Sequence, residues 1–452
     1  MSKEQSKEAR FVRLVATNRM VYNLCLPLTL HLLLSFVAYG AAFTSVQTCR
    51  YHQNRRYSTL HSSTSDGANE VVTKRSTTFE TTFATNRCTQ EPNRKWLRKF
   101  LSRNSTKRTP SYRIAYDYDE LAIGNAAAEN TTAVMLVHPI GVGIGKWYYD
   151  RLLKSLANAD VQSSRLVFIS PDLIGSYTAS SPIRSDSGQE LKKFPLLNIT
   201  DWAEQLEHLM SEYERKSWDE GHEIRNWAIV ANGGCAPIAL KVAQSAVVKS
   251  APFEKDLTNV VISSPPRLPF FLEGTDPKRV QRSYRTLSGI AGKLFWKYAL
   301  RKDGKFIQSF SERNLVGDPA SLGNHWTPNC VSAARHLGGK SKYSTFAFLA
   351  GSLMQDGCKD SLTSLKGTGV QIDFIRGTDR KQTRRPKSYF WKRKSSVKSA
   401  GAEAEVVKQE TVEEYIERNG NRGRTSLIGG RISLAWEDPK GYARELIKLI
   451  NY

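Results

Sequence analysis

The segment from Trp227 to Leu240 constrains the fold of this chain more than any other. It reads Trp-Ala-Ile-Val-Ala-Asn-Gly-Gly-Cys-Ala-Pro-Ile-Ala-Leu: an apolar run, a turn of small residues and a second apolar run. A short apolar run that ends at glycines indicates a buried strand, and the run after the turn has helical spacing. The sequence therefore predicts a strand, a tight turn and a helix, the unit from which parallel α/β sheets are built.

Short apolar runs alternate with helical patterns from about Tyr112 onward, which predicts an α/β fold with a mostly parallel sheet. We expect the strand that begins at Tyr112 to lie at the sheet edge, and Asp201 to cap its helix with Glu204. The expected strands are Ala133–His138, Leu166–Ser170, Trp227–Val230, Val260–Ser263, Val370–Arg376 and Thr425–Ile428. The expected helices are Trp147–Leu156, Asp201–Arg215, Ala236–Val247 and Pro439–Ile450.

The strand, turn and helix resemble the nucleophile elbow of the α/β-hydrolase superfamily (AB hydrolase-1 type), where a G-x-S-x-G turn presents a serine above the sheet. The resemblance covers about residues 112–452. The motif Leu-Val-His-Pro-Ile-Gly-Val-Gly at Leu136–Gly143 is similar to that of a cyanobacterial and plastid subfamily that generally lacks the elbow serine. The resemblance implies an α/β-hydrolase fold with helices on both faces of the sheet. It also implies a helical lid at about 265–345 and a basic loop insertion at about 380–424.

The positions that match the catalytic triad are degenerate. Gly233 stands at the nucleophile position and has no side chain with which to attack a substrate. We expect it to adopt the strained positive φ of an elbow, which glycine enters without cost. Asp379 matches the acid position. Arg431 stands in the histidine position, and a guanidinium stays protonated and is no general base. One hypothesis is that Asp379 and Arg431 form a salt bridge.

A cleft under the lid, lined by apolar and small residues, suits binding more than catalysis. Proline has no N–H, so Pro139 donates no oxyanion bond, whereas glycines allow close approach of a ligand. The leading prediction is a ligand-binding or interaction module for a small hydrophobic or anionic ligand, with no metal or cofactor. The candidate binding residues are His138, Pro139, Gly141, Gly143, Asn232, Gly233 and Gly234.

Two alternatives stay open. The first is an enzyme with non-standard catalytic residues that acts on a small ester-like or hydrophobic plastid metabolite. It would use His138, His325 or His336, or the thiol of Cys235 if a base lies nearby. The second is a partner-binding protein that uses the basic stretch Arg384–Lys394, in which Tyr389, Phe390 and Trp391 are interleaved.

The charge of the chain is unevenly placed. The formal net charge is +23, but residues 1–112 hold 18 Lys and Arg against 6 Asp and Glu, and residues 380–400 hold nine basic residues and no acidic one. The remainder is nearly neutral and carries no nucleic-acid-binding signature, so we expect no nucleic acid. The six cysteines have no C-x-x-C spacing, which indicates reduced thiols.

The N-terminus has the features of a targeting sequence. Basic residues precede the apolar run Leu24–Val37, and small residues Gly40–Ala42 follow it, as in a secretory signal peptide over 1–42. Residues 43–65 are rich in Arg, Ser and Thr, lack acidic residues and begin with Phe43, as in a transit peptide. Together they resemble the bipartite plastid presequence of diatoms, so we expect plastid localisation and no membrane span in the mature form. Residues 66–111 are expected to be a disordered linker.

Overall fold

The computed structural model describes residues 73–82, 111–124, 131–159, 161, 164–179, 183–184, 187–188, 190, 194–379 and 410–451. The expected signal peptide, the expected transit peptide and the basic stretch Arg384–Lys394 lie outside these residues. Among the described residues, no helix is both long enough and apolar enough to cross a bilayer.

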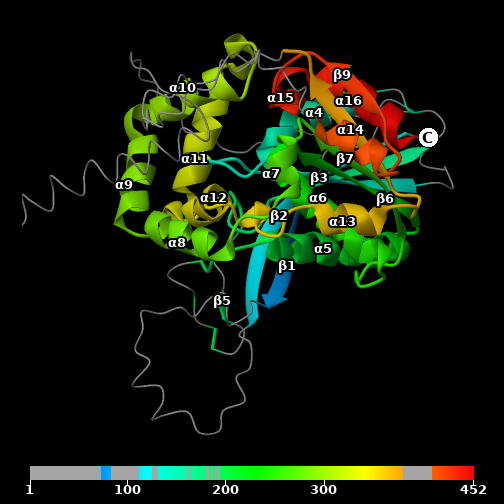
Figure 1. Cartoon of the computed structure of the whole chain (residues 1–452), viewed down its shortest axis with the longest axis horizontal. Helices are drawn as coiled ribbons and strands as arrows, with labels where there is room; N and C mark the ends of the chain where they lie inside the picture. The colour runs from blue at the N-terminus through cyan, green and yellow to red at the C-terminus, as the bar shows by residue number, and fades with distance from the viewer. Residues whose placement is uncertain are drawn as a thin grey trace, which may run out of the picture. The chain divides into compact units, whose positions relative to one another are not determined.

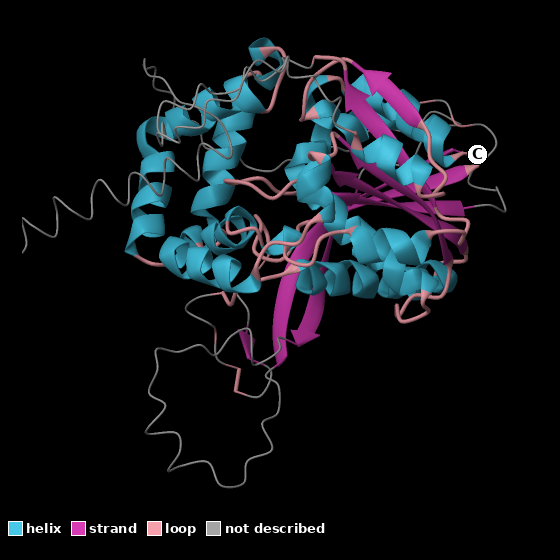
Figure 2. Cartoon of the chain, in the orientation of Figure 1, coloured by secondary structure: helices cyan, strands magenta, loops and turns pink. Residues whose placement is uncertain are grey.

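The described strands form one nine-stranded sheet (Figures 1 and 2). Its order is β1-β2-β4-β3-β6-β7-β8-β9, and β5 pairs with β2. The strands from β4 to β9 in this order run parallel, whereas β2 is antiparallel to both β1 and β4. The strand bounds are β1 Thr73–Thr82, β2 Ser111–Gly124, β3 Thr131–Val137, β4 Arg165–Pro171, β5 Ile183–Arg184, β6 Ile224–Asn232, β7 Asp256–Ser263, β8 Gln371–Gly377 and β9 Thr425–Ile428.

The central strands are apolar on both sides because both faces of the sheet are covered. In β3, Ala133, Met135 and Val137 belong to one hydrophobic cluster, while Val134 and Leu136 belong to a second. Successive side chains of a strand point to opposite faces. The sheet is therefore the middle layer of three, as expected for a parallel α/β sheet.

Helices pack on each face (Figure 1). One face is covered by α5 (Ile199–Asp219), α6 (Ala236–Val247) and α13 (Lys359–Leu365). The other face is covered by α4 (Asp150–Ala157), α15 (Leu434–Glu437) and α16 (Pro439–Ile450).

The N-cap of α5 differs from the prediction. Asn198, not Asp201, caps the helix: its Oδ1 accepts from Asp201 N (3.2 Å), and Asp201 Oδ2 accepts from Asn198 N (2.7 Å). The capping box therefore begins three residues earlier, because Ile199 and Thr200 already belong to the helix.

The lid follows β7, where the sequence places it. Its elements are α7 (Leu268–Leu272), α8 (Pro277–Ser288), α9 (Ile290–Ala299), η3 (Arg301–Gly304), α10 (Lys305–Asn314), η4 (Pro319–Leu322), α11 (Trp326–Gly339), α12 (Lys342–Leu349) and η5 (Ser352–Met354). Helices α8–α12 form a layer beside one end of the sheet (Figure 1). The helices extend a few residues beyond the expected end at 345, since α12 ends at Leu349.

Three segments depart from the predictions. The expected disordered linker 66–111 contains β1, whose threonine-rich sequence pairs with β2 from Thr73↔Glu120 to Thr82↔Ser111. The strand near Tyr112 is therefore not at the sheet edge. The expected loop insertion 380–424 contains α14 (Val412–Arg418), where a capping box at Thr411 and the buried Val412 and Ile416 stabilise a helix.

Candidate functional site

The segment that the sequence likens to a nucleophile elbow lies at the carboxyl end of β6. The strand ends at Asn232, and the short helix η2 (Gly233–Cys235) leads directly into α6. Gly233 does not adopt a positive φ, so the predicted strained elbow conformation is wrong. The short helix η2 turns the chain without a positive φ at Gly233. The requirement for glycine at this position therefore has a different cause.

The backbone just after β7 leaves no space for a side chain at Gly233. A Cβ built on Gly233 would lie 1.9 Å from the carbonyl oxygen of Ser264 and 2.7 Å from its carbonyl carbon. Real Cβ atoms do not approach backbone this closely. Ser264 is itself fixed, because its N–H donates to Ile375 O (3.0 Å) and its Oγ donates to Arg431 O (3.2 Å). The room that a nucleophile side chain needs is therefore taken by backbone.

The neighbouring elbow residues are also engaged in packing. Buried Asn232 donates from Nδ2 to Tyr148 Oη (3.3 Å) and to Ile432 O (3.2 Å). Burial raises the pKa of the Tyr148 hydroxyl well above its ordinary value. A Cβ on Gly234 would meet the ring of Phe348 at 3.3 Å, which is tight but not prohibitive.

His138 is a buried structural residue. Its Nδ1–H donates to Pro139 O (2.9 Å), and its Nε2 accepts from the N–H of Leu173 (3.1 Å). Burial lowers the pKa of His138, against the attraction of the nearby Asp172 carboxylate. Both ring nitrogens of the neutral imidazole are thus used within the protein, and His138 holds two loops together.

The pH dependence of stability should report this role. A lowered pKa in the folded state means that the unfolded chain binds the proton more tightly. The stabilising contribution is present above the unfolded value of about 6.5 and is lost as pH falls through the folded pKa, by at most about 1.4 kcal/mol per pH unit. Urea unfolding between neutral and mildly acidic pH should show a steeper loss of stability for the wild type than for His138→Gln. Equal slopes would contradict this assignment.

The loop after β3 is closed against the lid and the body. Gly143 has a φ of 69°, and a Cβ there would lie 1.8 Å from the carbonyl oxygen of Cys330 in α11. Thr345 of α12 donates to Gly141 O (2.9 Å). Gly143 therefore allows close approach of the lid backbone, whereas the sequence analysis expected the glycines of this loop to allow close approach of a ligand.

A buried ion pair fixes the far end of this loop. Lys146 Nζ lies 2.5 Å from Asp119 Oδ1, with both side chains almost fully buried, and Lys146 N donates to Asp172 Oδ1 (2.8 Å). Sequence analysis missed this pair because nothing in the local pattern links Lys146 to a carboxylate on another strand.

The predicted Asp379–Arg431 salt bridge is wrong. Among the described residues no ion pair joins them: the Arg431 guanidinium donates to Arg313 O, and exposed Asp379 donates from its backbone N–H to Gly430 O (3.0 Å). Arg313 is the penultimate residue of the lid helix α10 (Lys305–Asn314), so the Arg431 guanidinium contacts the lid and not Asp379.

The loop in the histidine position fastens the lid instead. The N–H groups of Ile432 and Ser433 both donate to Leu315 O (3.1 and 3.0 Å), and Gly317 N donates to Glu437 Oε1 (2.6 Å). With the Arg431 contact, these bonds form a latch between residues 431–437 and the lid segment 313–317. The sequence analysis did not predict these contacts, because the two segments lie more than a hundred residues apart in the chain.

The other candidate catalytic residues are not assembled into a site. Burial raises the pKa of the Cys235 thiol to about 12, so it is no nucleophile near neutral pH. His325 and His336 are exposed on the lid, and His336 packs edge-on against Tyr177. Within the described part of the chain, no cluster of three or more His, Cys, Asp or Glu could hold a metal ion.

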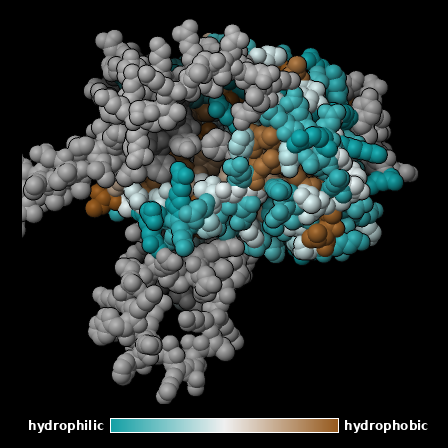
Figure 3. Space-filling model, viewed as in Figure 1, coloured by the Kyte–Doolittle hydropathy of each residue, from teal (hydrophilic) through white to brown (hydrophobic). Residues whose placement is uncertain are grey.

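Apolar surface remains around the elbow. Gly234 and Phe348 are only half-buried, and Leu349 and Ile432 expose 42% and 37% of their surface. Figure 3 shows hydrophobic residues at the surface near the middle of the view. Large exposed apolar residues gathered at one place commonly mark an interaction site.

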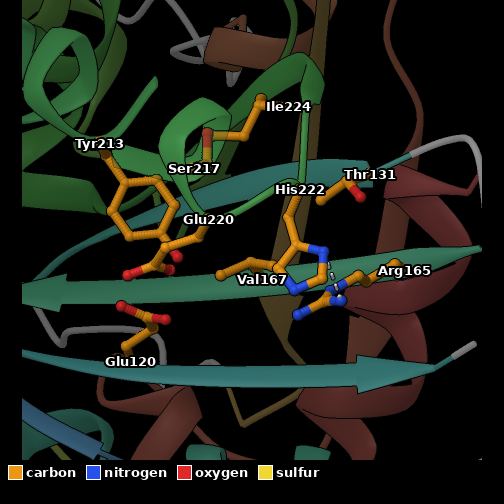
Figure 4. Close-up of a pocket in the computed structure, with 9 residues that line it drawn as sticks. All are labelled: Glu120, Thr131, Arg165, Val167, Tyr213, Ser217, Glu220, His222 and Ile224. Carbon is orange, nitrogen blue, oxygen red and sulfur yellow. Dashed lines mark hydrogen bonds between the residues drawn. The ribbon is translucent and has the colours of Figure 1, made fainter. Parts of the chain in front are cut away.

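A separate cavity of about 260 Å³ lies at the opposite ends of the strands. Thr131, Arg165 and Ile224, which begin β3, β4 and β6, line it. Figure 4 shows Arg165 and His222 on one side and the carboxylates of Glu120 and Glu220 on the other. Arg165 donates to His222 Nδ1 (3.4 Å) and Glu220 pairs with Lys216 (3.6 Å), so its charged walls have partners within the protein.

Comparison with known proteins finds similarity among solved structures only. No protein-family model and no curated protein sequence matches it. Solved structures similar to it include the peroxisomal α/β-hydrolase Lpx1 from Saccharomyces cerevisiae (14% identity, 84% of this chain and 89% of that one, TM-score 0.47). The epoxide hydrolase CorEH is also similar (11% identity, 74% of this chain and 95% of that one, TM-score 0.45). So is a haloalkane dehalogenase variant from Bradyrhizobium elkanii (13% identity, 74% of this chain and 93% of that one, TM-score 0.42).

The strand order, the elbow after β6 and the lid after β7 define an α/β-hydrolase-fold protein.

Proposed function

We propose that this α/β-hydrolase-fold protein works without Ser–His–Asp catalysis and binds a ligand beside its degenerate elbow. The observation that carries the proposal is the 1.9 Å approach of Ser264 O to the position of a Cβ on Gly233. The site differs from an active site by more than a missing hydroxyl, because the backbone of Ser264 occupies the space that a nucleophile side chain at Gly233 would need. The latch at 431–437 supports the same conclusion, since the loop that would carry a histidine holds the lid.

The ligand that this site fits is small and largely hydrophobic. Phe348 lies against Gly234, the exposed Leu349 follows Phe348 in α12, and the exposed Ile432 accepts a hydrogen bond from Asn232 through its carbonyl, so all three bring apolar surface to the elements that flank the elbow. Half-buried Arg431 has five N–H donors, and its contact with Arg313 O leaves others for an anionic group. A ligand with an apolar body and one acidic group would satisfy both features.

The test is mass spectrometry of small molecules that co-purify with the full chain from a plastid extract. We expect the wild type and the control Trp218→Asp to retain the same compound, and Leu349→Asp to lose it at least about tenfold, because a carboxylate opposes an apolar ligand. Both substituted residues are exposed, so folding should be spared. Equal retention by Leu349→Asp, or no retained compound, would contradict ligand binding at this site.

We also propose that the protein acts in the plastid. The support is the sequence alone: a basic segment, the apolar run Leu24–Val37 and an acid-poor stretch that begins with Phe43. A fusion of residues 1–65 to a fluorescent reporter should accumulate inside the plastid of a diatom. Signal confined to the endoplasmic reticulum or the medium would contradict this localisation.

A further inference from the structure

Helix α9 carries apolar residues on two faces, and only one of them is packed. Trp296 and Ala299 point into the core, and Trp296 packs edge-on against Phe346 (5.8 Å between ring centroids). Ile290, Leu294 and Tyr298 recur every fourth residue and expose 78%, 62% and 56% of their surface. Residues four apart lie on the same face of a helix, so the three form a continuous apolar row.

Exposed basic side chains accompany this row on α9 and on the adjacent helix α8. Lys293 and Lys297 are exposed on α9 at positions that place them beside it, and α8 adds the exposed Lys278, Arg279, Arg282 and Arg285. From Pro277 to Ala299 the chain holds these six basic residues and no acidic one. Burial lowers the pKa of Lys342, and the positive charges of Lys293 and Lys340 lower it further. In Figure 3, hydrophobic atoms lie at this outer edge of the lid beside hydrophilic surface.

We propose that the outer face of α8 and α9 binds the surface of an anionic lipid bilayer. An apolar row flanked by lysines and arginines is the pattern of helices that lie in the interface: the apolar side chains enter the acyl boundary while the cations contact headgroups. A tyrosine such as Tyr298 also fits the boundary between acyl chains and headgroups, because its ring is apolar and its hydroxyl is polar.

The charge pattern argues against a second copy of this chain as the partner of this face. A second copy packed on this face by twofold symmetry would bring the six cations of each copy together without an acidic partner on either helix. Like charges placed together across an interface oppose association. A surface of negative charge complements the face, and a bilayer also accepts the apolar row.

The test uses the full chain with vesicles of phosphatidylcholine alone or mixed with phosphatidylglycerol. The apolar run Leu24–Val37 can contact lipid too, so the readout is local: amide hydrogen exchange of peptides from Pro277–Ala299, followed as lipid is titrated. We expect exchange to slow with the anionic vesicles and not with phosphatidylcholine. Each cation near an anionic surface contributes about fivefold to binding, so Lys293→Gln with Lys297→Gln should weaken the protection about 25-fold. Ile290→Ser with Leu294→Ser should weaken it at least about tenfold.

The matched control replaces Lys440 and Lys448 of α16 by glutamine, which removes the same charge elsewhere and should leave the protection unchanged. Several results would overturn the proposal: no protection by anionic vesicles, equal protection of the lid variants, or an equal loss in the α16 variant. Protection that rises with protein concentration in the absence of lipid would assign the face to a second copy instead.

Discussion

Gly233→Ala should destabilise the folded protein by about 3 kcal/mol, although it adds a single methyl group. The methyl group would overlap fixed backbone, and no side chain could move aside to make room for it. The added Cβ would lie 1.9 Å from Ser264 O, and Ser264 is bonded to Ile375 and Arg431. Urea unfolding monitored by far-UV circular dichroism measures the difference.

The adjacent glycine provides the control. A Cβ on Gly234 meets only the half-buried ring of Phe348 at 3.3 Å, so Gly234→Ala should cost less than about 1 kcal/mol. Equal costs at the two positions would show that the loop after β7 yields easily and that a nucleophile could be accommodated. For the same reason, Gly233→Ser with Arg431→His should not produce an esterase.

Removing one partner of the buried Lys146–Asp119 pair should cost about 3–5 kcal/mol, because it leaves an uncompensated charge in the interior. The pair has a 2.5 Å contact, and Lys146 begins η1 (Lys146–Tyr149), just after the loop that faces the lid. Asp119→Asn and Lys146→Met should each show this loss in urea unfolding. Asp119→Leu combined with Lys146→Met should recover a large part of it, since no charge is then buried.

The exposed pair Lys216–Glu220 serves as the comparison. Its charges lie 3.6 Å apart with half-exposed side chains, so Glu220→Gln should cost less than about 1 kcal/mol. A small effect of Asp119→Asn, similar to that of Glu220→Gln, would contradict the role of the buried pair in fixing the loop.

Much of the fold was predictable because its signals are local. The bounds of α6, α16 and β9 match the predictions, since apolar periodicity and the residues Gly233–Gly234 and Pro439 mark where these elements begin or end. Strand β1 could not be predicted in this way. Its sequence Thr-Lys-Arg-Ser-Thr-Thr-Phe-Glu-Thr-Thr is polar, and its strand conformation depends on pairing with β2, about forty residues away.

The candidate site was predictable in its residues but not in its contacts. The elbow position of Gly233 follows from the sequence, whereas the Ser264 carbonyl that excludes a side chain belongs to a neighbouring strand end. The Arg431 guanidinium was expected to meet Asp379, yet it meets a backbone carbonyl of the lid. Such contacts depend on how the lid packs on the sheet, and the packing of the lid cannot be predicted from the pattern of residue types.

The most direct measurement of the central claim is intact-mass spectrometry of the full chain after exposure to a fluorophosphonate, with an active serine hydrolase treated in parallel. An activated serine reacts with this reagent, because its reaction depends on the same base and oxyanion site as catalysis. We predict an unmodified mass for this protein and no turnover of p-nitrophenyl esters. A single covalent adduct on any serine would show a working nucleophile and contradict the account.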